Sequence, residues 1–375
     1  VKDMLTAADE LGRISSYSTE KEFQNWDMWC RKYVLLGMQY YLEYCEDEEL
    51  RARVIASMRA QVDYLISKIG PEDEGKMRIT KTSKYWRGLN ASSILEPIVR
   101  LYKLSGEARY LDFASYIVSE GCTDVGNIFE LAYENIADPY QYPITKAYEM
   151  MSCFEGLLGY YACTGNKSAF DTALLFWNKV YDQEITLLGS GGADAPRNLG
   201  PGTGEQWNLT RQNQTNPDID LMMETCVTVY WMRLCYRLLT LTGEVKYVDA
   251  LEVSLYNAIV GALRPDGQFF EYFPKFNGQR NPRVNFSFNI EGFDLSCCTA
   301  NGPTGLCMAP YLYAMKTKTG GVLNLYENGS FTLDGVRFEV CSRYPLLGSA
   351  LLTVTDADTD APVTLGLRVP GFAQD

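Results

Sequence analysis

The chain has 375 residues, enough for one large domain or two of ordinary size. Hydrophobic residues make up 46% and charged residues 22%, the balance of a globular protein, and no apolar run has the length of a transmembrane helix. The formal net charge is −13. This charge argues against a nucleic acid or an anionic membrane as partner, because both require basic patches on the protein.

Eleven cysteines and the lack of histidine limit the chemistry that the chain can perform. Without histidine, Ser-His-Asp catalysis, Cys-His catalysis and histidine-ligated metal sites are all excluded. The cysteine count is odd and the chain is too long to need disulfides for its stability, so we expect reduced thiols. A metal site here must therefore use Cys, Asp or Glu side chains.

Residues 1 to about 315 carry the periodicity of amphipathic helices. Apolar residues recur at helical spacing in the stretches 29–44, 53–69, 93–104 and 227–239. This pattern predicts a mainly helical domain over residues 1–317.

A weak internal repeat runs through the helical region. A Ser-Gly or Thr-Gly pair follows an apolar stretch, and an aspartate stands six residues after the glycine; the three copies are Gly106 with Asp112, Gly165 with Asp171, and Gly243 with Asp249. Glycine commonly follows the last residue of a helix, so each copy predicts a helical hairpin, and we assign the aspartates structural roles. Repeated hairpins can close into an (α/α) toroid; a generic helical bundle is the alternative.

The pattern changes from about Gly320 onward. The apolar segments 322–326 and 331–333 flank Asn328-Gly329, a pair typical of hairpin turns. Apolar residues then alternate over 352–354 and 363–369. Residues 318–375 are therefore predicted to begin a β-sandwich domain, and so few strands lead us to expect that the domain is incomplete at its C-terminal end.

The adjacent pair Cys297-Cys298 is the most unusual local feature, and it lies in a polar loop before a predicted helix. Glu224 and Cys226 form a second candidate pair. Residues two apart point to nearly opposite sides of a helix, so both can bind one ion only if the chain is extended there, with a helix starting just after. Three thiolates and a carboxylate suit a tetrahedral Zn²⁺. The alternative is a buried structural cysteine and an unrelated cysteine pair.

A third feature is the segment Gly-Thr-Gly-Glu-Gln-Trp at residues 202–207. Its glycines would let a ligand approach the backbone, while Glu205 offers a group for proton transfer and Trp207 an aromatic face. Taken alone the segment is as well explained by an ordinary glycine-rich loop.

Together these features resemble glycoside hydrolase family 127, the β-L-arabinofuranosidase family that was once a domain of unknown function. The resemblance rests on the order Gly-Glu-aromatic, Glu-Thr-Cys, Cys-Cys and Asn-Gly, which begins at Glu205 and ends at Gly302. The stretches 26–32, 94–106, 269–272 and 367–372 are also similar. The likeness covers nearly the whole chain.

The resemblance implies an (α/α)6 barrel of the six-hairpin glycosidase type, followed by β-sandwich material. It implies that Zn²⁺ is bound by Glu224, Cys226, Cys297 and Cys298, and that Cys297 is also the nucleophile. Glu205 matches the general acid/base, and Tyr272 resembles a contact to the sugar. Trp207 and Trp86 are further candidate substrate contacts.

The chain departs from the family where the sugar is recognised. Family members carry histidines there, and the corresponding places are occupied here by Ser93, Lys146 and Gly202. The chain thus looks like a divergent member, a retaining exo-glycosidase that releases L-arabinofuranose or a similar L-furanose from plant-type glycans. A polysaccharide lyase or unsaturated-uronide hydrolase on an (α/α) toroid, and a zinc-stabilised carbohydrate-binding protein without activity, are the alternatives.

The expected partner is an oligosaccharide or glycoconjugate, with neither nucleic acid nor membrane involved, and a homodimer is compatible with the sequence. A nucleophilic thiol must remain reduced, which favours the cytoplasm. The periplasm is the alternative location.

Overall fold

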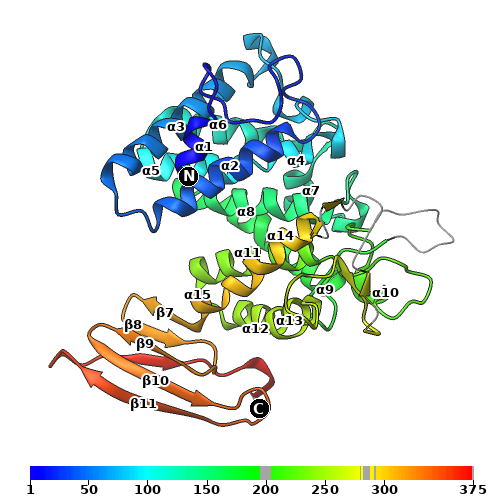
Figure 1. Cartoon of the computed structure of the whole chain (residues 1–375). Coiled ribbons are helices and arrows are strands. Elements are labelled where there is room, and N and C mark those ends of the chain that lie inside the picture. The colour runs from blue at the N-terminus through cyan, green and yellow to red at the C-terminus, as the bar shows by residue number, and fades with distance from the viewer. Residues whose placement is uncertain (195–203, 279, 282–287, 291–292, 374–375) are drawn as a thin grey trace. The chain divides into compact units, whose positions relative to one another are not determined.

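A computed structural model describes residues 1–194, 204–278, 280–281, 288–290 and 293–373 (Figure 1). The chain divides into two compact units. The first contains Val1–Ile185 and Gly191–Met222, and the second contains Thr186–Ser190 and Met223–Asp375. Among the described residues, no helix combines the length and apolar character needed to cross a membrane. The domain limits 1–317 and 318–375 stay a prediction.

The first unit is helical. Its helices are α1 (Lys2–Thr6), α2 (Asp27–Leu42), α3 (Glu48–Lys68), α4 (Leu89–Ser92), α5 (Leu95–Ser105), α6 (Ala108–Ser119), α7 (Ile128–Glu134), α8 (Ala147–Thr164), α9 (Lys167–Gln183) and α10 (Thr210–Asn213), with a small pair of strands, β1 (Cys122–Thr123) and β2 (Gly126–Asn127). Helix α8 is buried from Ala147 to Gly159 and packs against α4, α5, α6 and α9. It therefore forms the centre of this unit's core.

The second unit contains helices as well. They are α11 (Thr225–Thr242), α12 (Val245–Val253), α14 (Cys297–Cys307) and α15 (Ala309–Tyr313), and a π-helical segment (Ser254–Ile259) joins α12 to the short α13 (Val260–Ala262). Helix α11 packs against both α12 and α14. The predicted helical stretches 29–44, 53–69, 93–104 and 227–239 correspond to α2, α3, α5 and α11, so these four predictions are confirmed.

The three predicted hairpins are confirmed as α5–α6, α8–α9 and α11–α12. Gly106, Gly165 and Gly243 each follow the last residue of the first helix in left-handed conformation, with φ of 69°, 70° and 72°. Each glycine N–H donates to the carbonyl four residues earlier. Asp171 pairs with Lys167 at 2.7 Å and Asp249 pairs with Arg368 at 2.6 Å, which agrees with structural roles for these two aspartates.

Alanine at Gly165 is expected to lower the free energy of unfolding by about 1 kcal/mol. A Cβ added there meets nothing within 4 Å, so the cost comes from the left-handed backbone. Gly37, inside α2, is the matched control because its added Cβ also meets nothing and its backbone is helical. Gly37→Ala should stabilise by roughly 0.5–1 kcal/mol. Denaturant unfolding followed by circular dichroism measures the free energy of unfolding of both variants. If it changed in the same direction in both, the left-handed backbone would not be the cause of the cost at Gly165.

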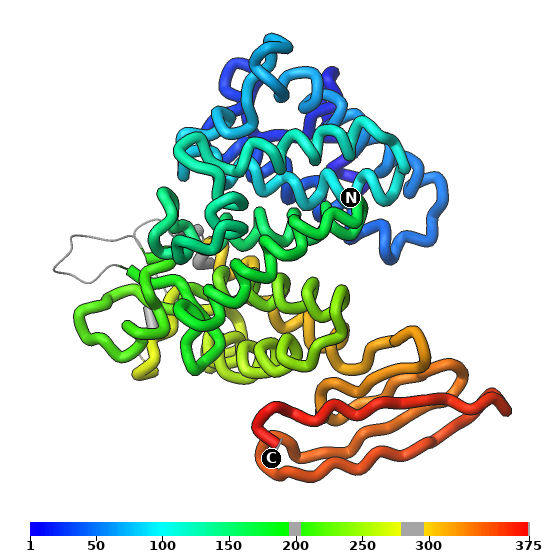
Figure 2. Tube along the Cα trace, turned by 180° about the vertical axis from the view of Figure 1, so that it is seen from behind, coloured from blue at the N-terminus to red at the C-terminus, as the bar shows by residue number. Residues whose placement is uncertain are grey.

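The second unit also contains all the strands beyond β2. Short pairs form from β3 (Phe273–Pro274) with β4 (Arg280–Asn281) and from β5 (Phe288–Ile290) with β6 (Phe293–Leu295). Two three-stranded sheets follow α15, with orders β12-β8-β7 and β11-β10-β9; they lie in the orange-to-red part of the trace in Figure 2. Their strands are β7 (Ala314–Thr317), β8 (Gly320–Leu323), β9 (Gly329–Leu333), β10 (Val336–Ser342), β11 (Ala350–Ala357) and β12 (Leu365–Leu367). The predicted change from helix to strand thus falls within a few residues of its expected place.

The hairpin predicted at Asn328-Gly329 is wrong. Strand β8 pairs with β7 and in parallel with β12, whereas β9 belongs to the other sheet, so the chain between β8 and β9 passes from one sheet to the other. The tight turn lies at Asp334-Gly335, where φ is 46° and 86°, and it joins β9 to β10. Asp-Gly is an equally typical hairpin pair, and the two signals stand only six residues apart.

Candidate metal centre

The start of α11 presents Glu224 and Cys226 to the same place. Glu224 is the residue before the helix and is extended, with φ −62° and ψ 129°, and Cys226 is the second helical residue. The extended backbone predicted at Glu224 is confirmed. Thr225, which lies between them, contacts a different segment. Its N–H donates to the Tyr272 carbonyl at 3.1 Å, and its hydroxyl donates to the Glu271 carbonyl at 2.7 Å.

The start of α14 carries the two adjacent cysteines. Ser296 precedes the helix, and its side chain accepts a hydrogen bond from the Thr299 N–H at 3.2 Å, which caps the first turn. Cys297 and Cys298 are therefore the first two helical residues; Cys297 is exposed and Cys298 is buried. One turn further on, a Cβ added to Gly302 would lie 2.2 Å from the Phe270 ring, so glycine permits α14 to pack this closely.

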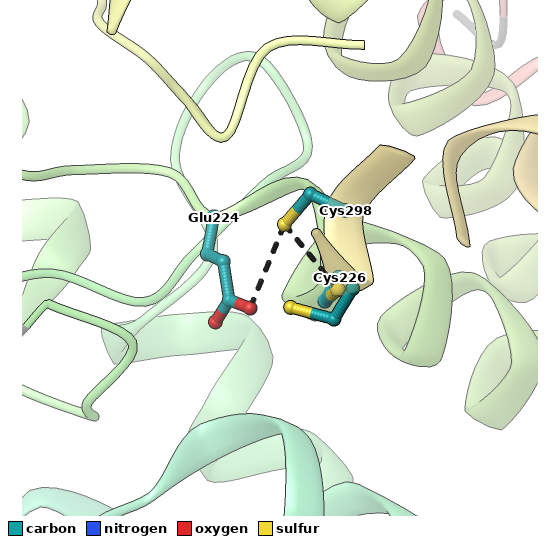
Figure 3. A group of neighbouring side chains, drawn as sticks. Glu224, Cys226 and Cys298 are labelled. Carbon is teal, nitrogen blue, oxygen red and sulfur yellow. Dashed lines mark hydrogen bonds between the residues drawn. The ribbon is translucent and has the colours of Figure 1, made fainter. Parts of the chain in front are cut away.

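These four side chains form one cluster, and Figure 3 labels three of them, Glu224, Cys226 and Cys298. The ligand atoms of Glu224, Cys226, Cys297 and Cys298 all lie within 4.8 Å of one another. Cys298 Sγ lies 3.3 Å from Cys226 Sγ and 3.8 Å from Glu224 Oε1. A tetrahedral ion with Zn–S bonds of about 2.3 Å separates two sulfurs by about 3.8 Å. The donor set and its spacing therefore fit Zn²⁺ without histidine.

Burial controls the protonation of the cluster. It raises the pKa of the Cys226 and Cys298 thiols well above the usual value, because a thiolate without a cation is poorly solvated there. Two effects act in the opposite direction. Both helices present their N-terminal ends, which favour negative charge, and a bound cation would favour the thiolates further. Metal binding at this cluster must therefore release protons.

Two further residues contact the cluster. The Tyr272 hydroxyl lies 3.2 Å from Cys297 Sγ, and the Asn301 amide nitrogen donates to Cys226 Sγ at 3.2 Å. Tyr272 was a candidate from the sequence, whereas Asn301 was not selected. Asn301 could have been selected from its position four residues after Cys297, because this spacing places the two side chains on one side of α14.

Glu205 lies in the first unit, where short backbone pairings support it. Its carbonyl accepts a hydrogen bond from the Ala147 N–H at 3.0 Å, and the Trp207 N–H donates to the Thr145 carbonyl at 2.8 Å. Its side chain is buried and accepts a hydrogen bond of 2.6 Å from Lys146 Nζ. Lys146 Nζ also lies 3.6 Å from Glu149. The sequence could not reveal this ion pair, because its members are 59 residues apart.

The two tryptophans that the sequence selected lie in different surroundings within this unit. Trp207 is completely buried, and its ring lies against Gly191, 3.1 Å from the position of an added Cβ. A fully buried ring offers no face to a ligand, so we assign Trp207 to packing and leave it out of the proposed site. Trp86 is half-buried, and the ammonium of Lys146 lies 5.5 Å from its ring centroid.

Of the three positions at which the resemblance led us to expect histidine, namely Ser93, Lys146 and Gly202, two are described. Ser93 is buried, and its hydroxyl donates to the Asn90 carbonyl at 2.6 Å. Lys146 holds Glu205. Gly202 lies outside the described residues. The two described positions are thus engaged within the protein itself.

Glu184 holds the segment that follows Trp207. This buried carboxylate accepts hydrogen bonds from the backbone N–H groups of Asn208, Leu209 and Thr210, at 3.2, 3.0 and 2.9 Å, and from the Thr210 hydroxyl at 2.9 Å. Even with these donors, burial raises the pKa of Glu184 to about 7 from 4.5. Its carboxylate anchors the chain three residues after Glu205.

Because the pKa of Glu184 is raised in the folded state, its contribution to the free energy of unfolding depends on pH. The contribution is fully present below the unfolded pKa of 4.5 and is lost as pH rises through about 7. The loss is on the order of 3 kcal/mol. The free energy of unfolding in urea should therefore differ less between pH 5 and pH 8 in Glu184→Gln than in the parent chain. An unchanged difference would contradict the assignment.

Comparisons with known proteins identify the family of the chain. The family model described as "Beta-L-arabinofuranosidase, GH127 catalytic domain" matches residues 5–310. The non-reducing end beta-L-arabinofuranosidase of Bifidobacterium longum subsp. longum is 24% identical over 349 residues, covering 84% of this chain and 50% of that protein. The chain thus spans about half the length of this curated relative.

Solved structures show the same fold. A GH127 beta-L-arabinofuranosidase from Geobacillus stearothermophilus T6 has a TM-score of 0.65 at 19% identity, covering 93% of this chain and 56% of that chain. A further GH127 beta-arabinofuranosidase has a TM-score of 0.65 at 22% identity, covering 91% and 50%. The predicted fold class, mainly helical of the (α/α)6 type with a C-terminal β region, is confirmed. Since the family model matches most of the chain, the protein belongs to glycoside hydrolase family 127.

Proposed function

We propose that this protein is a zinc-dependent retaining exo-glycosidase that releases β-L-arabinofuranose or a similar L-furanose from plant-type glycans. The observation that carries the proposal is the cluster of Glu224, Cys226, Cys297 and Cys298, in which three members are buried and Cys297 alone is exposed. Four protein ligands fill a tetrahedral zinc ion, so the reactive group has to be one of the ligands, and Cys297 is the exposed one. Family membership and the curated relative's activity support hydrolysis of a glycoside.

In the first step Cys297 Sγ attacks the anomeric carbon and the glycosidic bond breaks. Glu205 gives its proton to the departing oxygen, so the leaving alcohol departs neutral and the sugar remains as a thioglycoside on Cys297. In the second step Glu205, now ionised, takes a proton from water while that water attacks the same carbon, and the C–S bond breaks with Cys297 leaving as a thiolate. The free sugar leaves with retained configuration, and Cys297 and Glu205 return to their starting forms.

Glu224, Cys226, Cys297 and Cys298 would hold the metal. When bound, Zn²⁺ would keep Cys297 as a thiolate at neutral pH, although a free thiol has a pKa of about 8.5. The Tyr272 hydroxyl, 3.2 Å from Cys297 Sγ, orients this sulfur. Lys146 orients the Glu205 carboxyl group through its 2.6 Å hydrogen bond. Because this resting contact is an ion pair, Glu205 must take up a proton from solvent when the substrate binds, before the first step.

The test combines metal analysis with a panel of aryl glycosides. We expect about one Zn²⁺ per chain and turnover of β-L-arabinofuranosides or of related L-furanosides. The panel must be broad, because Ser93 and Lys146 stand where the family carries histidines. Zinc together with sugar binding but no turnover across the panel would favour the non-catalytic carbohydrate-binding protein, and elimination products would favour the lyase.

Glu205→Gln should lower kcat/KM by roughly 10²–10⁴-fold on substrates whose leaving group is a sugar, because the proton donor is lost. The loss should be smaller for an aryl glycoside with an acidic phenol, since this leaving group needs less protonation. Glu130→Gln makes the same change at an exposed position of α7 and should leave both rates unchanged. Equal losses on the two substrates would show that Glu205 is not the acid.

We further propose a reducing compartment, the cytoplasm in preference to the periplasm, because the reaction needs reduced thiols in the cluster. No disulfide joins the cysteines of the described residues. The proposed partner is an oligosaccharide or glycoconjugate substrate, and the homodimer stays a prediction.

A further inference from the structure

We propose that Trp26, Tyr85 and Trp86 form an aromatic platform that binds a neutral sugar ring of the substrate beside the Glu205 carboxyl group. The three residues lie in the first unit, on two segments about 60 residues apart in the sequence. The inference deepens the proposed function and rests on it for the identity of the sugar, but its test does not require turnover.

The rings of the platform are ordered and partly accessible. Trp26 and Tyr85 are stacked, with centroids 5.4 Å apart and an interplanar angle of 28°. Trp29 meets Trp26 edge-on at 6.0 Å and supports it from α2. Tyr85 is 46% exposed, and Trp26 and Trp86 are partly exposed. Aromatic faces of this kind bind apolar surfaces with defined geometry, and the C–H face of a sugar ring is such a surface.

Backbone strain is concentrated in the same two segments. Phe23, Asn25, Trp86 and Arg87 all have φ of 53–54°, a left-handed conformation that side chains other than glycine rarely adopt. Each such residue costs on the order of 1–3 kcal/mol and persists only where its surroundings enforce it. Such strain is a recurrent property of ligand-binding sites, and Trp86 is itself one of these four residues.

The surroundings that enforce this conformation are visible in the hydrogen bonds. The Asn25 carbonyl accepts two hydrogen bonds, from the Ser83 hydroxyl at 2.6 Å and from the Asn90 amide at 3.0 Å. Arg87 is held by Asp124, whose N–H donates to the Arg87 carbonyl at 3.0 Å and whose carboxylate accepts from Arg87 Nε at 2.7 Å. The two segments are thus locked together, and the platform exists before a ligand arrives.

The platform continues directly to the proposed acid. The ammonium of Lys146 lies 5.5 Å from the Trp86 ring centroid and donates to Glu205 at 2.6 Å. A single side chain therefore separates the Trp86 ring from the Glu205 carboxyl group. A sugar ring stacked on the platform would occupy a position next to the one whose glycosidic oxygen Glu205 protonates.

The charges around the platform favour a neutral ligand. Lys146 is paired with Glu205, and Arg87 and Lys81 are both paired with Asp124 at 2.7 Å. These charged groups are thus engaged with one another rather than with an ionic ligand. These features together select an uncharged polyol ring.

Calorimetric titration of the Cys297→Ser chain with neutral oligosaccharides tests the platform. The probes are β-L-arabinofuranosyl disaccharides, arabino-oligosaccharides and xylo-oligosaccharides. We expect at least one to bind, and Tyr85→Ala and Tyr85→Leu in this background to weaken that binding by about tenfold. Tyr133→Ala is the matched control, because Tyr133 is also exposed, at 53%, and lies on α7 outside the platform.

The outcomes separate the two proposals. The platform is overturned if the Cys297→Ser chain binds a probe and both Tyr85 variants in that background bind it equally well. It is also overturned if the Cys297→Ser chain binds none of the probes. In the chain with Cys297 intact, Tyr85→Ala should raise KM for the longer substrates while kcat stays nearly constant. A tenfold loss of binding in a protein that hydrolyses no glycoside would refute the hydrolase and leave the platform standing.

Discussion

Replacement of Cys297 by serine is expected to lower kcat by roughly four orders of magnitude or more. Serine has nearly the same size, but its hydroxyl is far less acidic than a thiol and gives a much weaker nucleophile at neutral pH. Cys297 is the exposed member of the cluster, so its sulfur is the one that a sugar can reach. Initial rates on the substrate identified by the glycoside panel measure the effect.

The zinc content of the same variant distinguishes a chemical role from a structural one. Glu224, Cys226 and Cys298 remain, and three protein ligands are enough to retain Zn²⁺ in catalytic sites. Cys297→Ser should therefore keep most of its metal and its fold while losing turnover. Substantial activity in this variant would show that the reaction does not use Cys297 as its nucleophile.

Cys298→Ser is expected to lose Zn²⁺, with an affinity at least 100-fold below that of the parent chain. Cys298 is fully buried and lies within 3.8 Å of both Cys226 Sγ and Glu224 Oε1, so it connects the two halves of the cluster. Serine offers no thiolate to the ion. Competition with a zinc chelator, together with elemental analysis, measures the affinity, and activity should fall in parallel with metal content.

The zinc affinity of the parent chain should also rise with pH. Burial raises the pKa of the Cys226 and Cys298 thiols, so both carry protons at neutral pH when no metal is bound. Zinc must displace these protons, and the displacement becomes easier as pH increases. Chelator competition at pH 6 and pH 8 should therefore give the tighter binding at pH 8.

Cys235→Ser is the matched control for the loss of metal. Cys235 is equally buried and lies on α11, nine residues after Cys226, but it is not a member of the cluster. This variant should retain zinc and activity even if its stability falls. If Cys235→Ser and Cys298→Ser lose metal to the same extent, damage to the core rather than loss of a ligand would explain both results.

The features predicted correctly were those that depend on neighbours in the sequence. The glycines after α5, α8 and α11 could be recognised because the end of a helix is decided within a few residues. The extended Glu224 could be recognised because one ion cannot bind residues two apart on a helix. The hairpin at Asn328-Gly329 was wrong because a turn pair does not reveal to which sheet each strand belongs.

The sequence by itself determined the helical hairpins and the chemistry of the donor set, because helix ends are local and the lack of histidine leaves cysteine and carboxylate as ligands. Only the tertiary structure decided that Cys297 is exposed while Cys298 is buried, that Trp207 is packed away, and that Lys146 holds Glu205. Burial and ion pairing arise where segments distant in the sequence meet, and no local pattern records which side chains will meet there.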